Sequence, residues 1–295
     1  MLTLRRRCGN SLVRIMVSER CDGDCAPLDG SAPSAVTVLR QVHGTRVVEV
    51  TRPGGHRGTC ADAAWTSAPQ ATLAVRSADC VPVALYGADA NGDGAVAVIH
   101  AGWRGLLDGV VPATFAELRR HGIRDVRAVI GPHICALHYE FGACELSAAI
   151  TAFGPSVAAT TSWGTPALDL GEAARLALRR HGAVIDCEIG RCTASDERYF
   201  SHRARGERGR TAVLIRLEAK PWPERPASDS EQGRQATDAT TGRFSSPLGR
   251  LEAKPWPERP VSDSEQEREA SGATTGRFAS PLGRLEVDPE GEAPG

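Results

Sequence analysis

Over the first 217 residues, short apolar runs of strand length alternate with three longer segments of helical periodicity. The runs predict strands over residues 35–42, 46–50, 72–77, 81–87, 94–101, 126–131, 167–170, 184–190 and 211–217. The helical segments span residues 106–122, 144–154 and 170–182, and Gly122 and Gly182 lie where C-terminal stops are expected. Strands in succession with few helices between them favour an α+β fold over a regular doubly wound sheet. We therefore predict a single domain, residues 1–217, of mixed β-sheets with packed helices.

The chain begins with a basic segment, MLTLRRRCGNSLVRIMVS, that contains no acidic residue before Glu19. Such a start resembles an organelle transit peptide. It has no apolar h-region or small-residue cleavage site, which argues against secretion. We interpret the segment as a first strand that follows a basic tip.

Residues 218–295 differ in character from the rest of the chain. A unit of 34 residues at 217–250 returns almost unchanged at 251–284. It is rich in Pro, Ser, Glu and Arg, so it cannot bury enough apolar area to offset the entropy of ordering. We predict a disordered tail that contains two tandem repeats. Trp222 and Trp256 occupy the same position in KPWPERP and could contact an unknown partner, although a passive tail is the simpler interpretation.

Charge and composition narrow the partners and the compartment. The formal net charge is −1 at pH 7, and there is no basic patch with interleaved aromatic residues, which argues against a nucleic-acid-binding protein. No apolar run reaches the ~18–20 residues that cross a bilayer, so no membrane span is expected. The nine cysteines form an odd set without a regular framework, which is typical of a reducing compartment. These observations favour small partners and a cytoplasmic location.

The stretch TLAVRSADCVPVALY, residues 72–86, has polar groups in the middle of an apolar segment. Ser77, Asp79 and Cys80 separate two strand-like halves, and Pro82 cannot donate a ladder hydrogen bond. We interpret the stretch as two strands joined at a functional corner, with the sheet broken or edge-like at Pro82.

Three residues at the ends of apolar strand runs form a candidate metal site: His43, Cys80 and His100. Imidazole and thiolate bind a borderline-soft ion such as zinc, and three protein ligands with an open fourth position are the pattern of a catalytic site. Their separations are too long for a zinc-finger knuckle but suit ligands that neighbouring strands bring together. Taken singly, each residue also fits an ordinary histidine or a small buried cysteine. Gly44 and Gly102 allow the backbone to approach closely beside the histidines.

Two other segments offer guanidinium groups. Arg104, in GWRG, lies near the start of a predicted helix, where it could hold an anion or serve as an ordinary surface residue. The loop at 192–210 is rich in hydroxyl and guanidinium groups and could line a phosphate or sugar pocket. For Arg205, Arg208 and Arg210 we favour a solvated loop.

The segment IGPHICALHYEFG, residues 130–142, contains His133, Cys135 and His138, which could form a second metal cluster. Gly-Pro followed by mixed residues is more often a turn whose rings pack locally. We favour the turn.

Several motifs occur together in a fixed order: QVHG (41–44), ADAAWT (61–66), SADCVPV (77–83), HAGWRGL (100–106), IGPHI and YEFG (130–142), and CT and YFSHR (192–203). In this order they resemble the YfiH family, which has been called multicopper polyphenol oxidase or laccase-like, and purine nucleoside phosphorylase. The resemblance covers about residues 15–217 and excludes the repeats.

The resemblance implies a single α/β domain in which two histidines and one cysteine bind zinc in a pocket, with copper as the less favoured ion. By motif position these ligands are His43, Cys80 and His100. The implied activity is phosphorolysis of adenosine, inosine, guanosine and methylthioadenosine to base and ribose 1-phosphate, with adenosine deaminase activity in addition. Purine nucleosides and phosphate are therefore the expected partners.

The sequence departs from the family pattern at two places. SERCDGDCAPL (18–28) is the nearest match to the family's opening R-x-G-G-x-S-type segment, which makes Arg20 the equivalent residue there. Where the family has paired cysteines before Tyr-Glu, this chain has Leu137 and His138.

The two implied reactions suggest roles for further residues. Zinc lowers the pKa of a bound water toward ~7, which gives deamination a direct route, and Asp79, adjacent to Cys80, is the candidate catalytic group for moving protons. Phosphorolysis requires cations that hold phosphate. The candidates for binding phosphate or substrate are Arg20, Arg104, His202 and Arg203.

Three other functional classes stay open. Cys80, activated by His43 or His100, could be the nucleophile of a hydrolase. A copper-dependent polyphenol oxidase fits the older family name, but a single His2Cys set cannot supply several copper centres. A cell-wall quality-control or other binding role would use the pocket for recognition alone.

Overall fold

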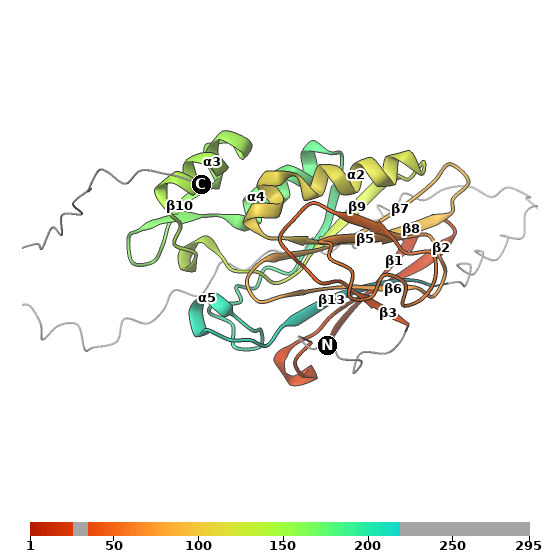
Figure 1. The fold of residues 1–295 in the computed structure, drawn as a ribbon, viewed down its shortest axis with the longest axis horizontal. Coiled ribbons are helices and arrows are strands. Elements are labelled where there is room, and N and C mark those ends of the chain that lie inside the picture. The colour runs from red at the N-terminus through yellow and green to blue at the C-terminus, as the bar shows by residue number, and fades with distance from the viewer. Residues whose placement is uncertain (26–34, 219–295) are drawn as a thin grey trace, which may run out of the picture. The chain divides into compact units, whose positions relative to one another are not determined.

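Two mixed β-sheets stack face to face, and helices cover the outer face of the larger sheet (Figure 1). The computed structural model describes residues 1–25 and 35–218. The predicted tail thus lies outside the described residues, apart from Glu218, and the repeats likewise apart from Leu217 and Glu218, which end the last strand. The prediction of an α+β fold with mixed sheets and packed helices is confirmed.

The smaller sheet has the strand order β1-β2-β13-β6-β3. Its strands are β1 (Leu2–Cys8), β2 (Ser11–Val17), β13 (Thr211–Glu218), β6 (Thr72–Ser77) and β3 (Val36–Val38). Neighbours are antiparallel except β3 and β6, which are parallel. The basic N-terminal segment forms the hairpin β1–β2, which turns at Gly9 with a φ of 56°. The expected first strand is therefore two paired strands.

The larger sheet has the order β12-β9-β7-β8-β5-β4. Its strands are β12 (Val184–Glu188), β9 (Arg124–Ile130), β7 (Val81–Ala88), β8 (Gly94–Ala101), β5 (Ala63–Thr66) and β4 (Val47–Glu49). Both of its faces are covered. Along β8, Ala97 and Ile99 pack in the core beneath the helices, whereas Val96 and Val98 pack in the core between the sheets. This is why β8 reads as a continuous apolar run rather than an alternating one.

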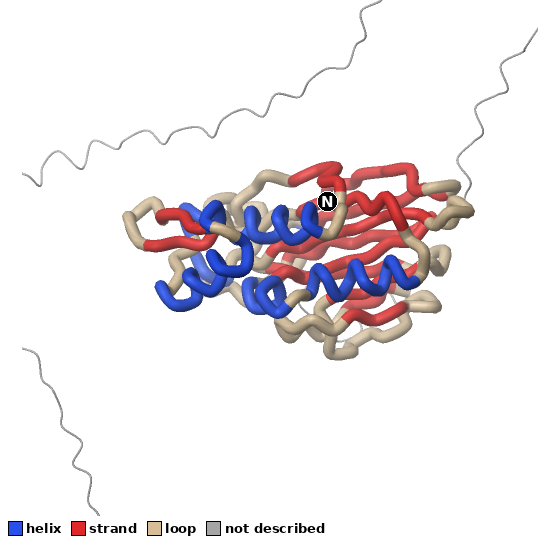
Figure 2. Tube along the Cα trace, turned by 90° about the horizontal axis from the view of Figure 1, so that it is seen from above, coloured by secondary structure: helices blue, strands red, loops and turns tan. Residues whose placement is uncertain are grey.

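The helices lie together on one side of the larger sheet (Figure 2). They are α1 (Trp103–Asp108), α2 (Val110–Arg120), α3 (Ala143–Phe153) and α4 (Leu170–Arg180), with a short α5 (His202–Arg205) elsewhere. Smaller elements are the 3-10 turns η1 (Arg20–Asp22), η2 (Ala136–His138) and η3 (Pro155–Val157) and the ribbon β10 (Ala158–Thr160) with β11 (Pro166–Leu168). Within the described ranges, no helix is long and apolar enough to span a membrane.

The single helix predicted over 106–122 is two helices. Gly109, with a φ of 100°, closes α1 by donating its N–H to the carbonyl of Gly105 at 3.0 Å, and it also begins α2. A left-handed residue cannot continue an α-helix, and glycine adopts this conformation without a steric penalty. The stops predicted at Gly122 and Gly182 are confirmed, with φ values of 75° and 90°.

Two strand predictions need correction. The run 35–42 forms a strand only over Val36–Val38, because the chain then leaves the sheet and makes an isolated bridge between Arg40 and Cys60. The corner between β6 and β7 exists as predicted, but Pro82 is not at a sheet edge, since β7 lies between β8 and β9. Pairing with β9 begins only at Val83, so the missing N–H of Pro82 leaves no gap in that ladder.

Candidate active site

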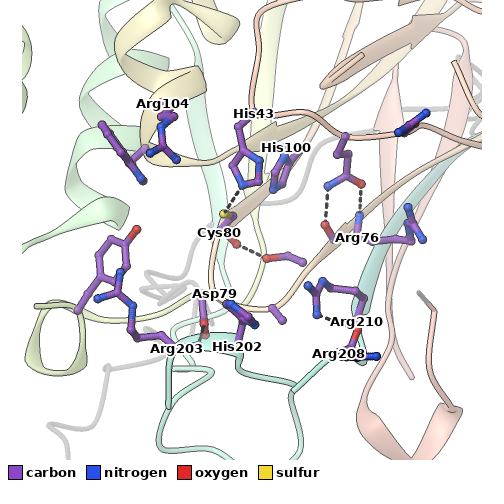
Figure 3. Close-up of a pocket in the computed structure, with 16 residues that line it drawn as sticks. His43, Arg76, Asp79, Cys80, His100, Arg104, His202, Arg203, Arg208 and Arg210 are labelled. Carbon is purple, nitrogen blue, oxygen red and sulfur yellow. Dashed lines mark hydrogen bonds between the residues drawn. The ribbon is translucent and has the colours of Figure 1, made fainter. Parts of the chain in front are cut away.

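Three connections between the two sheets meet at one end of the sandwich, where they surround a cavity of about 540 Å³ (Figure 3). Strands β3 and β6 run in parallel and end where the antiparallel strand β13 begins, which brings the connections together. The connection β3–β4 contains His43, β6–β7 contains Asp79 and Cys80, and β12–β13 contains His202 and Arg203. Residues distant in sequence therefore line one cavity.

His43, Cys80 and His100 lie together at this cavity, as their positions at strand ends predicted. Their candidate ligand atoms all lie within 4.8 Å of one another. The Sγ atom of Cys80 is 3.6 Å from Nε2 of His43, and the rings of His43 and His100 are 4.8 Å apart at 73°. His100, at the end of β8, is buried, Cys80 is half-buried and His43 is exposed. The cluster is thus open to the cavity on the side of His43.

Asp62, which sequence reasoning did not select, accepts hydrogen bonds from both His43 and His100. Its Oδ1 accepts a hydrogen bond from Nδ1 of His100 at 2.8 Å. Its two oxygens also accept the backbone N–H groups of Val42, His43 and Gly44 at 3.1, 2.9 and 2.8 Å. Burial opposes ionisation of Asp62, but these hydrogen bonds outweigh it and lower the pKa of the carboxyl. An acidic residue directly before a buried strand, in ADAAWT, was the signal available in the sequence.

The charges of Cys80 and His100 stabilise each other. Burial alone would raise the pKa of Cys80, but the neighbouring His100 and His43 lower it from 9.0 to about 6. Burial would likewise lower the pKa of His100, but Cys80 and Asp62 raise it from 6.5 to about 9. Without a metal ion, these opposite pKa shifts favour the charged pair, a thiolate beside an imidazolium.

The donor set fits a thiophilic metal ion. Zinc bond lengths of about 2.3 Å to sulfur and 2.0–2.1 Å to nitrogen put two tetrahedral donors about 3.5 Å apart, close to the 3.6 Å between Cys80 and His43. A Cβ atom on Gly102 would lie 2.5 Å from Cδ2 of His43 and 3.2 Å from Sγ of Cys80. The backbone thus approaches both residues as closely as the glycine allows, which agrees with the close approach expected there.

Asp79 joins the loops around the cavity. Its carboxylate accepts hydrogen bonds from Oγ1 of Thr193 at 2.6 Å, from Oγ of Ser201 at 2.7 Å and from the backbone N–H of Arg203 at 2.6 Å. Its φ of 105° lies in the left-handed region, which is unfavourable for a residue with a Cβ atom. These contacts join the corner at Asp79 to the loops that contain Thr193 and Ser201, and the predicted role of Asp79 in moving protons stays a prediction.

Arginine side chains dominate the cavity. Those that line it are Arg40, Arg76, Arg104, Arg203, Arg208 and Arg210; His202 lines it as well, and Asp79 is the acidic one among the described lining residues. Burial and then the charge of Arg210 lower the pKa of Arg76. Arg104 stacks on Trp103, with Cζ 4.4 Å from the ring centre. Such a surface attracts an anion.

Sequence reasoning found part of this cationic surface. The cavity is lined by three of the residues predicted to bind phosphate or substrate, namely Arg104, His202 and Arg203. It is also lined by Arg208 and Arg210, which were predicted to lie in a solvated loop. Arg40 and Arg76 were not selected, because nothing in a strand sequence shows which end of the sheet it faces.

Arg20 does not line the cavity. Its guanidinium donates to the carbonyl of Glu197 at 2.8 Å and to Glu207 at 2.7 Å, and it lies over the ring of Phe200. The proposed role of Arg20 in phosphate binding stays a prediction without support from its position.

The segment 130–142 forms the predicted turn, which contains η2, but its polar residues fall into two groups with different partners. Nδ1 of His133 bonds to the carbonyl of Gly131 at 2.9 Å. Cys135 and His138 instead lie beside Cys192, which sequence reasoning had not connected with them.

The fold and the cluster define an α+β domain of two stacked sheets with a His2Cys group at a cationic cavity. The family model described as multi-copper polyphenol oxidoreductase laccase matches residues 24–218, and the chain belongs to this family, also known as the YfiH family. The resemblance drawn from the motifs is confirmed.

Several relatives are named purine nucleoside phosphorylase. One from Streptomyces coelicolor is 38% identical over 192 residues, which cover 64% of this chain and 78% of the relative. One from Mycobacterium bovis is 36% identical over 194 residues, which cover 64% and 75%. Among solved structures, YfiH of Bacillus licheniformis has the same fold, with a TM-score of 0.59, 23% identity and coverage of 72% of this chain and 99% of that one. YlmD from Geobacillus stearothermophilus aligns with a TM-score of 0.57, 25% identity and coverage of 71% and 92%.

Proposed function

We propose that this chain is a purine nucleoside phosphorylase whose active site is the cavity around His43, Cys80 and His100. The observation that carries the proposal is the opening of this three-ligand cluster into a cationic cavity of about 540 Å³, a volume typical of small-molecule sites. The names of relatives at 36–38% identity support the same activity. The substrates are a purine nucleoside and inorganic phosphate, and the expected compartment is the cytoplasm.

In this reaction a phosphate oxygen forms a bond to C1′ of the ribose while the bond from C1′ to the purine nitrogen breaks, and the purine takes up a proton. Arg104, His202 and Arg203 hold the phosphate, and the two guanidinium groups offset its charge. The rings of Trp103 and Tyr139, which also line the cavity, offer apolar surface to the purine. Zinc, held by the His2Cys cluster, would supply Lewis acidity.

Adenosine deamination is the second reaction that we propose for the same cavity. The oxygen of a water molecule adds to the purine carbon that bears the amino group, and ammonia leaves. Asp79, next to Cys80 at the corner, is the candidate for moving the proton. Substitution of Asp79 by Asn would separate the two roles, because an amide keeps part of the hydrogen bonding but cannot take up a proton.

A hydrolase that uses Cys80 as its nucleophile is the alternative with specific support. The lowered pKa of Cys80, about 6, makes the thiolate available at neutral pH, and His43 lies 3.6 Å away. The copper-dependent oxidase of the family description and a binding role remain hypotheses that metal analysis and substrate assays address.

The test is to purify the full chain, measure its metal content and incubate it with adenosine in the presence and absence of phosphate. Adenine and ribose 1-phosphate formed only with phosphate support phosphorolysis, and inosine formed in both conditions supports deamination. If zinc-loaded protein forms neither adenine nor inosine, both reactions are refuted.

The variant Cys80→Ser separates the two roles of the thiol. Loss of zinc together with activity supports ligation, whereas loss of activity with zinc retained supports the nucleophile. The exposed cysteine Cys144 provides a matched control as Cys144→Ser.

A further inference from the structure

Cys135, His138 and Cys192 form a second cluster of metal-binding side chains, and none of them lines the active-site cavity. Sγ of Cys135 lies 3.3 Å from Nδ1 of His138, and Sγ of Cys192 lies 3.6 Å from the same nitrogen. The three candidate ligand atoms are all within 4.8 Å of one another. Nothing in the proposed reaction uses these groups.

The backbone around this cluster is built to hold the donors together. Cys135 precedes the single 3-10 turn η2, so the Cys-x-x-His spacing places its sulfur and the ring of His138 on the same side. The backbone N–H of Cys135 donates to Sγ of Cys192 at 3.2 Å, a contact that stabilises a thiolate. An isolated parallel bridge between His133 and Cys192 fixes the two segments side by side.

We propose that Cys135, His138 and Cys192 bind a zinc ion at a site that is separate from the active site. Two thiolates and one imidazole are a typical zinc donor set. Tetrahedral zinc places sulfur and nitrogen donors about 3.5 Å apart, and the two sulfur–nitrogen distances are 3.3 and 3.6 Å. A water molecule would complete the fourth position.

The bound ion would clamp two segments that hold Asp79. The backbone N–H of Ile134, next to Cys135, donates to the carbonyl of Asp79 at 3.0 Å. Thr193, next to Cys192, donates through Oγ1 to the carboxylate of Asp79 at 2.6 Å. The ion would therefore stiffen the corner that bears Cys80. Because metal binding is counted without substrate, this proposal and the proposed phosphorolysis can fail independently.

The experiment titrates Zn²⁺ into the reduced, metal-free full chain in competition with a chromophoric chelator. We expect the wild type and the control Cys144→Ser to bind two equivalents of zinc per chain. Cys80→Ser and Cys192→Ser should each bind one equivalent, and the variant that carries both substitutions should bind none. Cobalt substitution gives a second measure, because the sulfur-to-cobalt band that remains in Cys80→Ser comes from two thiolates. That band should be about twice as intense as the one that remains in Cys192→Ser.

Two results would overturn the proposal. One is a wild-type stoichiometry of one equivalent that Cys80→Ser abolishes and Cys192→Ser leaves unchanged. The other is a disulfide between Cys135 and Cys192 in protein purified with reductant and zinc. If the buried Cys192 does not tolerate serine, His138→Ala at the half-buried histidine takes its place, with circular dichroism to verify folding.

Discussion

Asp62 and His100, both buried, are joined by a hydrogen bond of 2.8 Å from Nδ1 of the histidine to the carboxylate. A carboxylate on the outer nitrogen fixes the tautomer and orientation of a ligating histidine. Asp62 also accepts the backbone N–H of His43 at 2.9 Å. One side chain thus places two of the three candidate ligands of the active site.

Replacement of Asp62 by Asn should lower zinc affinity at the active site by about 10–100-fold. The asparagine amide has one acceptor oxygen instead of two. Its NH2 group must therefore face at least one of the N–H groups whose hydrogen bonds Asp62 accepts, and that hydrogen bond is lost. Chelator competition measures the change. Asp186→Asn, which alters an aspartate paired with Arg6, serves as the control. Unchanged affinity in the Asp62 variant would show that the histidines are positioned without it.

Gly102→Ala should disturb the same cluster by contact rather than by charge. The new Cβ atom would lie 2.5 Å from the ring of His43, which must then move. A displacement of about 1 Å can reduce activity about 100-fold, so we expect a loss of that order with lower zinc occupancy. The matched control is Gly190→Ala, since a Cβ atom there meets nothing within 4 Å. Equal activity of the two variants would contradict the tight fit at Gly102.

In metal-free protein, alkylation of Cys80 should follow a pH profile with a midpoint at about 6. The pKa is lowered, so the reactive thiolate predominates above this pH and disappears as the pH falls through it. Iodoacetamide labelling with peptide mass spectrometry measures the alkylation of Cys80 at each pH. The labelling step with this midpoint should be missing in Cys80→Ser. The buried Cys8, whose pKa is raised to about 11 by burial, should label slowly throughout. A Cys80 midpoint near 9 would mean that the histidines do not stabilise its thiolate.

Arg104→Gln should raise the KM for phosphate about tenfold or more, because a hydrogen bond to a charged group contributes about 1.5–3 kcal/mol. Steady-state kinetics at varied phosphate measures this, with Arg179→Gln on the exposed end of α4 as the control.

Arg20→Gln tests the remaining prediction from the motif comparison. A raised KM at unchanged melting temperature would assign Arg20 to phosphate, whereas a lowered melting temperature alone would assign it to its contact with Glu207.

Truncation after Glu218 should leave activity and melting temperature nearly unchanged. The composition of residues 219–295 is too poor in apolar groups to contribute a packed core. Glu218 must be kept, since it ends β13 and pairs with Arg14 at 2.5 Å. Differential scanning fluorimetry and the nucleoside assay compare the two proteins. A large drop in either would show that the tail contributes to the domain.

The parts of the molecule that the sequence predicts are those set by local patterns. Strand β8 is recognisable because both of its faces are buried, and Gly122 and Gly182 mark helix ends because each follows the same Arg-Arg-His sequence. Taken singly, His43 and Cys80 also fit ordinary residues, so they stand out only together with His100, as a set of metal-binding side chains beside apolar runs whose motifs occur in a fixed order.

The parts that sequence reasoning missed depend on contacts between distant segments. Asp62 has no visible partner until β5 is placed beside β8. Cys192 joins Cys135 across 57 residues through the packing of two loops. The short strand β5 and the interruption of α1 by Gly109 are too brief for periodicity to resolve.

Because the connections that contain His43 and Cys80 each pass from one sheet to the other, these residues are tethered to both layers at once. If one sheet slid over its neighbour by a single residue, each layer could keep its own hydrogen bonds while the thiol and the imidazole moved apart. Alignment between the layers is therefore a requirement for an intact His2Cys cluster in its own right, distinct from the folding of either sheet.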